Sequence, residues 1–185
     1  ILDDTASMRH PLWKFPERAL RPHTMRNERE ERAKKIDEGD HRGVAGSAYL
    51  DLDGDIGMLP SGGGASLTAM DALYRKGGRP ANYTEYSGNP TGDKVARLVA
   101  IVVSKPNLRA LWVVGAIANF TDIHETLSGL IEGLRRARKE FGYAIDFPII
   151  IRRGGPREVE AYDMLKKATD FHLVITGADT SIEES

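Results

Sequence analysis

Cysteine is absent from the sequence, and so are long apolar runs. Without cysteine the 185 residues hold no disulfide and no thiolate metal ligand, which is typical of proteins in a reducing cytoplasm. The longest apolar run, ALWVVGAIA at 110–118, is far shorter than the roughly 20 residues of a membrane-spanning helix. The 26 Lys and Arg residues almost balance the 27 Asp and Glu residues, which leaves no strong field to attract nucleic acid or an anionic membrane. We expect a cytoplasmic protein that binds neither.

Two regions of the chain differ in composition. Residues 1–47 are rich in charge and poor in large apolar side chains, and the stretch MRNEREERAKKIDEGDHRG predicts a solvated helix or an extended linker. Before it, RHPLWKFPERALRPH combines prolines with a tryptophan, which favours contact with another domain. The first residues, ILDD, include no methionine, so we expect a piece of a longer protein. Residues 48–185 are long enough for one domain with its own core.

From residue 48 onward, strand and helix patterns alternate. AYLDL and DIGML flank Asp53-Gly54, a dipeptide favoured in tight hairpins. Further short strands are expected in ANYTEYSG, RALWVVGAI, FPIII and FHLVIT. Helical stripes occur in SLTAMDALYRKGG, DKVARLVAIVVSKP, the segment 123–134 and PREVEAYDMLKKA. In the first of these helices the face expected to be buried consists of Leu67, Met70, Leu73 and Tyr74.

This alternation predicts an α/β fold. The expected architecture is a doubly wound, mainly parallel sheet with helices on both faces, preceded by an irregular N-terminal segment. Ligands of such sheets bind beyond the carboxyl ends of the strands, and three unusual loops fall there.

The first of these loops is SGGGAS, residues 61–66. Its glycines let backbone N–H groups approach an anion, and the helix that follows adds the positive end of its dipole. Glycine loops also often serve only to turn the chain, and this one lacks the lysine of a P-loop.

The second loop, GAIANFT at 115–121, carries polar residues where a buried strand ends. Thr121 or Asp122 can cap the following helix, with Glu125 completing a capping box from Asp122. Capping does not account for Asn119, which precedes the cap. An amide and a hydroxyl beside free helix N–H groups form a neutral pocket for a carboxylate, so Asn119 and Thr121 each have a structural and a ligand-binding interpretation.

The third loop, in IIIRRGGP, places two arginines at the end of a buried strand. Side chains alternate along a strand, so Arg152 and Arg153 are expected to point to opposite sides, one toward the site and one toward another layer. An arginine binds a carboxylate through two parallel, charge-assisted hydrogen bonds. A salt bridge to a neighbouring acid is the alternative. Gly154-Gly155, which lets the backbone approach closely, favours anion binding.

Four motifs in this order and spacing, SGGGAS, ANYTEYSG, GAIANFT and IRRGGP, closely resemble the citrate-binding domain of the ATP-citrate lyase family. The resemblance covers nearly all of residues 47–180. It extends more distantly to the β subunit of succinyl-CoA synthetase, through YLDLDGDIG and the glycine loop. It implies a flavodoxin-like, succinyl-CoA synthetase-type domain. LDDTASMRHP resembles the end of a preceding ATP-grasp domain, so residues 1–47 would be the end of that domain with a charged linker, and 48–185 the citrate-binding, CoA-ligase-type domain.

The resemblance also implies a division of labour. In the family, ATP phosphorylates a histidine on a CoA-binding, α-type partner subunit or domain, and the phosphate passes to citrate. Coenzyme A then gives citryl-CoA, which a citrate-synthase-like domain cleaves to acetyl-CoA and oxaloacetate. This chain would hold citrate as part of a β-type subunit in a hetero-oligomer, with ATP and magnesium bound by the ATP-grasp domain. The loop that bears the histidine is missing, so we expect no turnover from this chain alone and no catalytic residue among its five scattered histidines.

The same motifs assign individual residues. The family's citrate contacts fall on Gly88, Asn119, Thr121 and Arg153. The glycine loop that precedes the helix facing the phosphohistidine consists of Gly62, Gly63, Gly64, Ala65 and Ser66. Asp3 falls on a magnesium-binding aspartate of the ATP-grasp domain, and we expect it to need that domain to bind metal.

One departure from the family pattern concerns the helix after Thr121. The animal enzyme has a tyrosine near citrate there, and this chain has Ala137 near that position. Either citrate is held slightly differently, or another residue such as Tyr143 substitutes.

Two rival functions follow from the same residues. A subunit of a succinate–CoA ligase, or of another acid–CoA ligase, has the same fold and mechanism with a smaller acid, and would bind succinate more tightly than citrate. A non-catalytic docking module would use the glycine loop and the arginines to bind a partner chain. A tricarboxylate that raises the melting temperature would favour the ligand pocket over the docking module.

Overall fold

A computed structural model describes residues 27–185 of the chain and shows a parallel sheet at its centre. Four strands, β2 (Ile56–Ser61), β4 (Ala110–Ile117), β5 (Ile149–Gly154) and β6 (Leu173–Thr176), lie in the order β2-β4-β5-β6. All neighbouring pairs are parallel. The expected strands of the central sheet are therefore confirmed. Asp3, the predicted magnesium-binding residue, lies outside the described residues.

The far edge of β2 is accompanied by an irregular segment, residues 80–86. Parallel bridges join Ile56 to Pro80 and Ser61 to Tyr86, and the Asn82 side chain bonds both the N–H and the C=O of Met58. With this segment in place the spatial order of the strands is that of a flavodoxin-like sheet. In that order, successive strands are added first on one side of β2 and then, from β4 onward, on the other. The carboxyl ends of β2 and β4 are thus the expected ligand position of this fold.

The hairpin expected around Asp53-Gly54 is wrong. The strand before it, β1 (Leu50–Asp51), pairs antiparallel with β3 (Asn82–Tyr83), not with β2. The N–H of Gly54 bonds to Pro80 O, so the turn delivers the chain into the large sheet instead of folding it back. The predicted short strand in ANYTEYSG is confirmed as β3.

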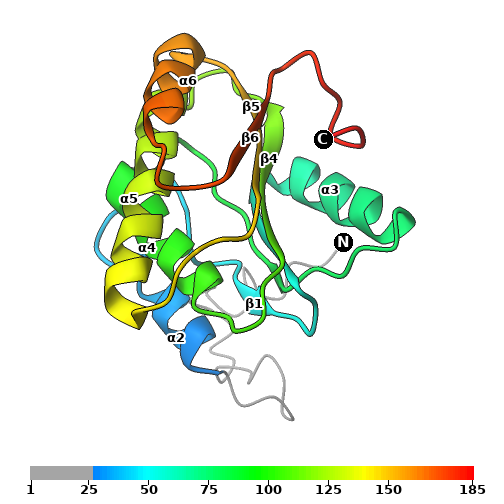
Figure 1. Cartoon of the computed structure of the whole chain (residues 1–185). Coiled ribbons are helices and arrows are strands. Elements are labelled where there is room, and N and C mark those ends of the chain that lie inside the picture. Colours follow the sequence, from blue (N-terminus) through cyan, green and yellow to red (C-terminus); the bar gives the residue numbers. More distant parts are fainter. Residues whose placement is uncertain (1–26) are drawn as a thin grey trace, which may run out of the picture.

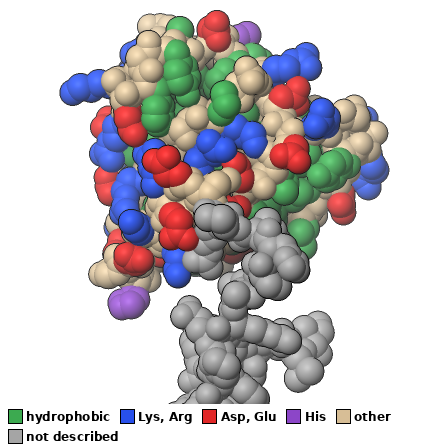
Figure 2. Space-filling model, turned by 90° about the horizontal axis from the view of Figure 1, so that it is seen from below, with side chains coloured by type: hydrophobic (Ala, Val, Ile, Leu, Met, Phe, Trp, Pro, Cys, Tyr) green, Lys and Arg blue, Asp and Glu red, His purple; other side chains and the backbone are tan. Residues whose placement is uncertain are grey.

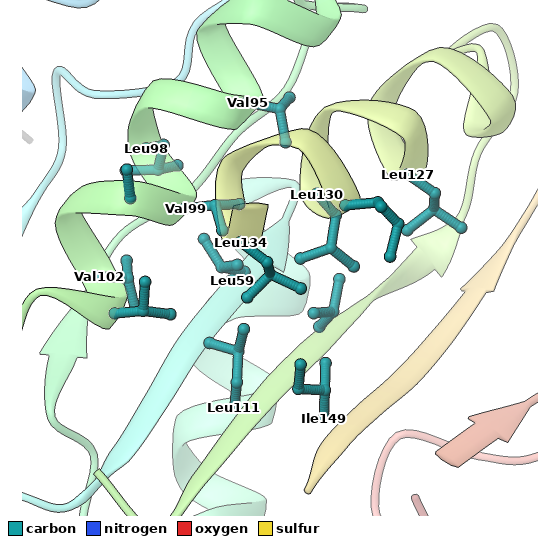
Figure 3. Packing of buried hydrophobic residues seen from close by; sticks show 14 of the residues in the cluster. Leu59, Val95, Leu98, Val99, Val102, Leu111, Leu127, Leu130, Leu134 and Ile149 are labelled. Atoms are coloured by element: carbon teal, nitrogen blue, oxygen red, sulfur yellow. The ribbon is translucent and has the colours of Figure 1, made fainter. Parts of the chain in front are cut away.

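Helices cover both faces of the sheet (Figure 1). On one face lie α4 (Gly92–Val103), α5 (Ile123–Phe141) and α6 (Glu158–Lys167), and on the other lies α3 (Gly63–Arg75). The main core forms where the apolar stripes of α4 and α5 meet β2, β4 and β5 (Figure 3); its labelled members include Leu59, Val99, Leu111, Leu130, Leu134 and Ile149. The doubly wound arrangement predicted from the sequence is confirmed.

The buried face of α3 differs from the expected one. Ala69 and Ala72 pack against Trp112 of β4, while Leu67 and Tyr74 are 59% and 56% exposed. Met70 and Leu73 of the predicted stripe are partly buried against the same cluster, whereas Leu67 and Tyr74 lie outside it because the small alanine side chains let the helix approach the sheet closely. The helix itself was predicted correctly and only its orientation was wrong.

The charged segment before residue 47 is part of the packed structure. Helix α2 (Glu28–Lys34) buries Ala33, and Ile36 after it is 1% exposed. Lys94 of α4, only 2% exposed, pairs with Asp37 at 3.3 Å. The prediction of a helix is confirmed for 28–34, but its apolar side is not solvated. The domain boundary at 47 stays a prediction.

The surface shows mixed charge. Seen from the end where α2 and β1 lie, Lys and Arg side chains alternate with Asp and Glu side chains (Figure 2). This agrees with the near balance of 26 basic and 27 acidic residues. None of the helices within 27–185 is long and apolar enough to cross a membrane.

Candidate functional site

Arg153 is the most deeply buried charged side chain at the carboxyl edge of the sheet. It is 1% exposed and lies on the face covered by α4 and α5. Its Nη1 donates to Ala116 O at 3.2 Å, and its Cζ lies 5.6 Å from the centre of the Tyr86 ring. The Tyr162 hydroxyl of α6 donates to the backbone oxygen of Arg153. Both ends of the residue are therefore fixed.

The remaining donors of Arg153 have no partner among residues 27–185. Nε and Nη2 are buried, and neither donates a hydrogen bond to an acceptor in that part of the chain. These two nitrogens share one edge of the planar guanidinium, which is the edge that binds a carboxylate through two parallel hydrogen bonds. Buried donors are almost always paired in folded proteins, so this edge is a candidate position for a bound acceptor group.

Arg152 confirms the predicted split between the two arginines. It faces the α3 side and donates to the backbone oxygens of Gly115, Ala178 and Thr180. Neither arginine forms an ion pair with an acid in the described part of the chain, so the salt-bridge alternative is not realised there. Arg152 anchors the C-terminal residues, whereas Arg153 keeps two nitrogens without a partner in the described part of the chain.

The glycine loop begins α3 without a side-chain cap. Gly62 has φ 90°, and its N–H donates a hydrogen bond to Tyr86 O, which holds the start of the loop in place. No acid lies in the first turn, and a Cβ on Gly64 would meet only open space. The positive end of the helix dipole is thus accessible, as an anion site requires. Ser66, in contrast, is buried, and its hydroxyl donates to Gly63 O at 2.8 Å.

Glu85 adds a negative group beside this loop. Its Oε2 would lie 2.8 Å from a Cβ on Gly63, which places the carboxylate next to the first turn of α3. This oxygen is buried and has no hydrogen-bond partner among residues 27–185. The same holds for Oγ1 of the preceding residue, Thr84. A carboxylate is stabilised by the dipole at this end of a helix.

The loop that carries Gly88 is held against the start of α5. Gly88 has φ 69° and Asn89 has φ 58°, and the Asn89 side chain accepts from Asp122 N at 3.0 Å. A Cβ on Gly88 would lie 3.2 Å from Gly43 Cα. Gly88 and the residues just before α5 are therefore neighbours at the carboxyl edge.

Asp122, not Thr121, caps α5. Its carboxylate accepts from Glu125 N at 2.9 Å and pairs with Arg157 at 2.8 Å. Partial burial acts to raise the pKa of Asp122, but the Glu125 N–H and the Arg157 guanidinium outweigh it and lower the pKa. The capping role proposed for Thr121 is wrong, and the capping box is only half formed because the Glu125 side chain accepts from Gly92 N instead.

Thr121 and Asn119 flank this cap differently. Thr121 is 7% exposed and Asn119 is exposed. Ala118 N donates to Gly154 O at 2.8 Å, which joins this turn to the strand end that carries Arg153. The four residues predicted to contact a carboxylic acid thus come from loops gathered at one edge of the sheet.

Tyr143 cannot replace the family's tyrosine near Thr121. It follows the C-terminal end of α5, whose 19 residues span about 28 Å, whereas Thr121 precedes the N-terminal end. The Tyr143 hydroxyl donates to Val103 O at 2.6 Å. Ala137 is fully buried in the core late in the same helix. The suggested substitution by Tyr143 is therefore wrong.

Tyr86 is the site residue that the sequence interpretation missed. It lies within ANYTEYSG, a motif recognised for its resemblance, and an aromatic residue in a polar loop was the available signal. It is 1% exposed and joins Arg153 to the glycine loop.

Two surface hollows lie away from this edge. One of about 460 Å³ lies between α5 and α6, and one of about 720 Å³ lies between α3, the sheet and the C-terminal residues. Neither is lined by Arg153. Arg153 is almost fully buried, and its free edge is not open to solvent in this structure.

Comparisons with known proteins show the family of the chain. A family model described as "ATP citrate lyase citrate-binding" matches residues 26–184. Among solved structures, ATP citrate lyase from Methanothrix soehngenii in complex with citrate and coenzyme A is similar over 97% of this chain, with a TM-score of 0.77 and 27% identity. A mutant of Methanosaeta concilii ATP citrate lyase in complex with (3S)-citryl-CoA is similar with a TM-score of 0.76 and 27% identity, also over 97% of this chain.

Curated relatives of the chain include the β subunit of an ADP-forming succinate–CoA ligase from Desulfurococcus amylolyticus, 32% identical over 89% of this chain. The corresponding subunit from Roseiflexus is 30% identical over 91% of this chain. The chain spans only 38% and 39% of these two relatives, and 50% and 48% of the two solved lyase chains.

Proposed function

Because this chain belongs to the ATP citrate lyase citrate-binding family, we propose that residues 48–185 hold citrate within a β-type subunit of an ATP-dependent citrate–CoA ligase or lyase. The observation that carries the proposal is the buried Nε–Nη2 edge of Arg153, which has no partner among residues 27–185. One carboxylate of citrate would bind this edge. Gly88, Asn119 and Thr121 would supply uncharged donors around it.

The charges at the site suit a tricarboxylate that is about to react. A single guanidinium does not neutralise three carboxylates, so the remaining charge must face solvent or other positive groups. The N-terminus of α3, beside the Glu85 carboxylate, supplies a partial positive charge at the same edge. In the proposed scheme that helix faces a phosphohistidine of an α-type partner, and Arg153 and its neighbours orient the carboxylate that takes the phosphoryl group.

The other reactants would be held elsewhere. ATP and magnesium would bind the ATP-grasp domain, and coenzyme A would come with the α-type partner of a hetero-oligomer. Within 27–185 there is no group of three or more His, Cys, Asp or Glu residues placed to hold a metal. The described residues bind and orient, so we expect no turnover from this chain alone.

Calorimetric titration with citrate tests the proposal. Arg153→Ala is expected to weaken citrate binding about 10- to 150-fold, because bonds from a charged donor contribute about 1.5–3 kcal/mol. Arg109→Ala is the matched control, since Arg109 is an arginine at the opposite edge with an 81% exposed side chain. Equal affinities of the wild type and Arg153→Ala would remove Arg153 from the site. Wild-type protein that gives neither heat nor a thermal shift with millimolar citrate would favour the docking module.

A succinate–CoA ligase subunit is the second candidate. It is favoured by the 32% identity to the Desulfurococcus relative. Succinate presents two carboxylates and no hydroxyl, so it would use the Arg153 edge but fewer of the surrounding donors. Parallel titrations with the two acids decide between them: tighter binding of citrate supports the first proposal, and tighter binding of succinate supports the second.

A further inference from the structure

Gly115 leaves the space that Arg153 fills. It lies within β4, where glycine weakens a strand relative to alanine, so a reason for its presence is expected. Its backbone is not in the left-handed region that favours glycine. A Cβ at this position would overlap Arg153 Nη1 and would lie 3.0 Å from Ser61 Cβ. Space, and not backbone conformation, therefore accounts for the glycine.

Tyr86 provides the second support of the guanidinium. Its ring centre lies 5.6 Å from Arg153 Cζ, within the range of an attractive cation–π contact. The residue is 1% exposed, and its backbone is held because Tyr86 N donates to Pro60 O and Tyr86 O accepts from Gly62 N. The backbone of Tyr86 is thus fixed to the end of β2 and the start of the glycine loop.

These contacts use every part of the guanidinium except one edge. Nη1 donates to Ala116 O and occupies the space above Gly115, and Cζ lies over the Tyr86 ring. Nε and Nη2 remain. We propose that Gly115 and Tyr86 are positioning residues that hold Arg153 with its Nε–Nη2 edge free for a carboxylate; the assignment of the ligand rests on the proposed function, whereas the anchoring does not.

The anchoring is tested by NMR without any ligand. The Nε–H signal of Arg153, identified by its loss in Arg153→Lys, should be displaced by the ring current of Tyr86 and should exchange slowly with water. Tyr86→Leu and Gly115→Ala should each move this signal and speed its exchange. Tyr86→Phe keeps the ring and should keep most of the displacement. Tyr83→Leu, at a tyrosine of β3, is the matched control and should leave the signal in place.

The second arm measures citrate affinity in a double-mutant cycle. Gly115→Ala and Tyr86→Leu should each weaken citrate binding at least about tenfold in the wild-type background, corresponding to about 1.4 kcal/mol. In the Arg153→Ala background the same substitutions should have no further effect, because the group they position is gone. Substitutions that merely damage the domain would weaken binding equally in both backgrounds.

Each outcome decides one part of the inference. A wild-type Arg153 signal that is undisplaced and exchanges rapidly overturns the anchoring, and so does a signal that neither substitution moves. If one variant does not fold, the other carries the same test. Equal losses of affinity in both backgrounds overturn the positioning role in binding. A signal that moves as expected, together with unchanged citrate affinity in Arg153→Ala, overturns the proposed function and leaves the anchoring standing.

Discussion

Arg152 and Arg153 are adjacent in the chain and lie on opposite faces of the sheet, with Gly115 of β4 in contact with both. Arg152 Nη1 donates to Gly115 O, while Arg153 Nη1 lies over the position where Gly115 has no side chain. The first arginine uses its donors on the protein's own carbonyl groups, and the second keeps one edge free. The same residue type therefore has a structural role on one face and a proposed ligand-binding role on the other.

Arg152→Ala should destabilise the fold and leave citrate affinity nearly unchanged. Arg152 is 7% exposed, and its loss leaves three backbone oxygens without their charged donor. We expect a decrease of about 2–4 kcal/mol in the free energy of unfolding. Urea denaturation measures this decrease, and faster amide exchange at 178–182 should accompany it. A loss of citrate binding as large as that of Arg153→Ala in folded protein would contradict the division between the two arginines.

Gly133→Ala should destabilise the protein although alanine favours helices. A Cβ at Gly133 of α5 would lie 2.5 Å from Ala96 O and 2.7 Å from Val99 Cβ, so α4 and α5 would have to separate. We expect a loss of about 1–3 kcal/mol in unfolding free energy. Gly64→Ala is the control, because a Cβ there meets open space, and it should be neutral or stabilising by up to about 1 kcal/mol. Thermal denaturation of both variants checks the pair, and a stabilised Gly133→Ala would be the contrary result.

Asp122→Ala should destabilise α5, and Thr121→Val should not remove the cap. Asp122 accepts from Glu125 N and pairs with Arg157, whereas Thr121 does not serve as the N-cap. Loss of an N-cap costs about 0.5–2 kcal/mol. Urea titrations of the two variants should show the larger decrease for Asp122→Ala. The reverse order would restore the capping role to Thr121.

Stability should decrease in acid through Asp37. Burial acts to raise the pKa of Asp37, but hydrogen bonds from the Ser47 hydroxyl and from the Gly46 and Ala45 N–H groups outweigh it and hold the pKa below its ordinary value of 3.8. A carboxyl whose pKa is lowered by folding stabilises the native state above its unfolded pKa, and this contribution disappears as the pH falls below about 4. Denaturation midpoints between pH 7 and pH 3 measure the effect. Asp37→Asn should lower stability at pH 7 by about 1–3 kcal/mol and lose less on acidification; an unchanged acid profile would contradict this assignment.

The sequence was most informative where apolar spacing is strong. The stripes of α4 and α5 and the continuous apolar runs of β4 and β5 predicted those elements correctly, because such patterns fit only one period. The orientation of α3 was not predictable in the same way. Close packing of Ala69 and Ala72 against Trp112 decided it, and small residues leave little trace in a hydrophobic pattern.

The pairing of β1 and the roles at the site depended on distant residues. Asp53-Gly54 is compatible with a hairpin. The N–H groups that follow Asp53 instead donate to the backbone oxygens of Pro80 and Arg79. Alternation along β5 predicted that the arginines diverge, yet which of them is free follows only from the carbonyl groups each one meets. The contact of Tyr86 with Arg153 joins residues 67 positions apart, and no local sequence pattern predicts it.

A crystal structure of the protein with bound citrate would show which group holds the acid. We expect one citrate carboxylate with its two oxygens about 2.7–2.9 Å from Nε and Nη2 of Arg153, with Nη1 still on Ala116 O. Citrate bound at another edge of the sheet, with Nε and Nη2 paired to a protein group, would contradict this expectation.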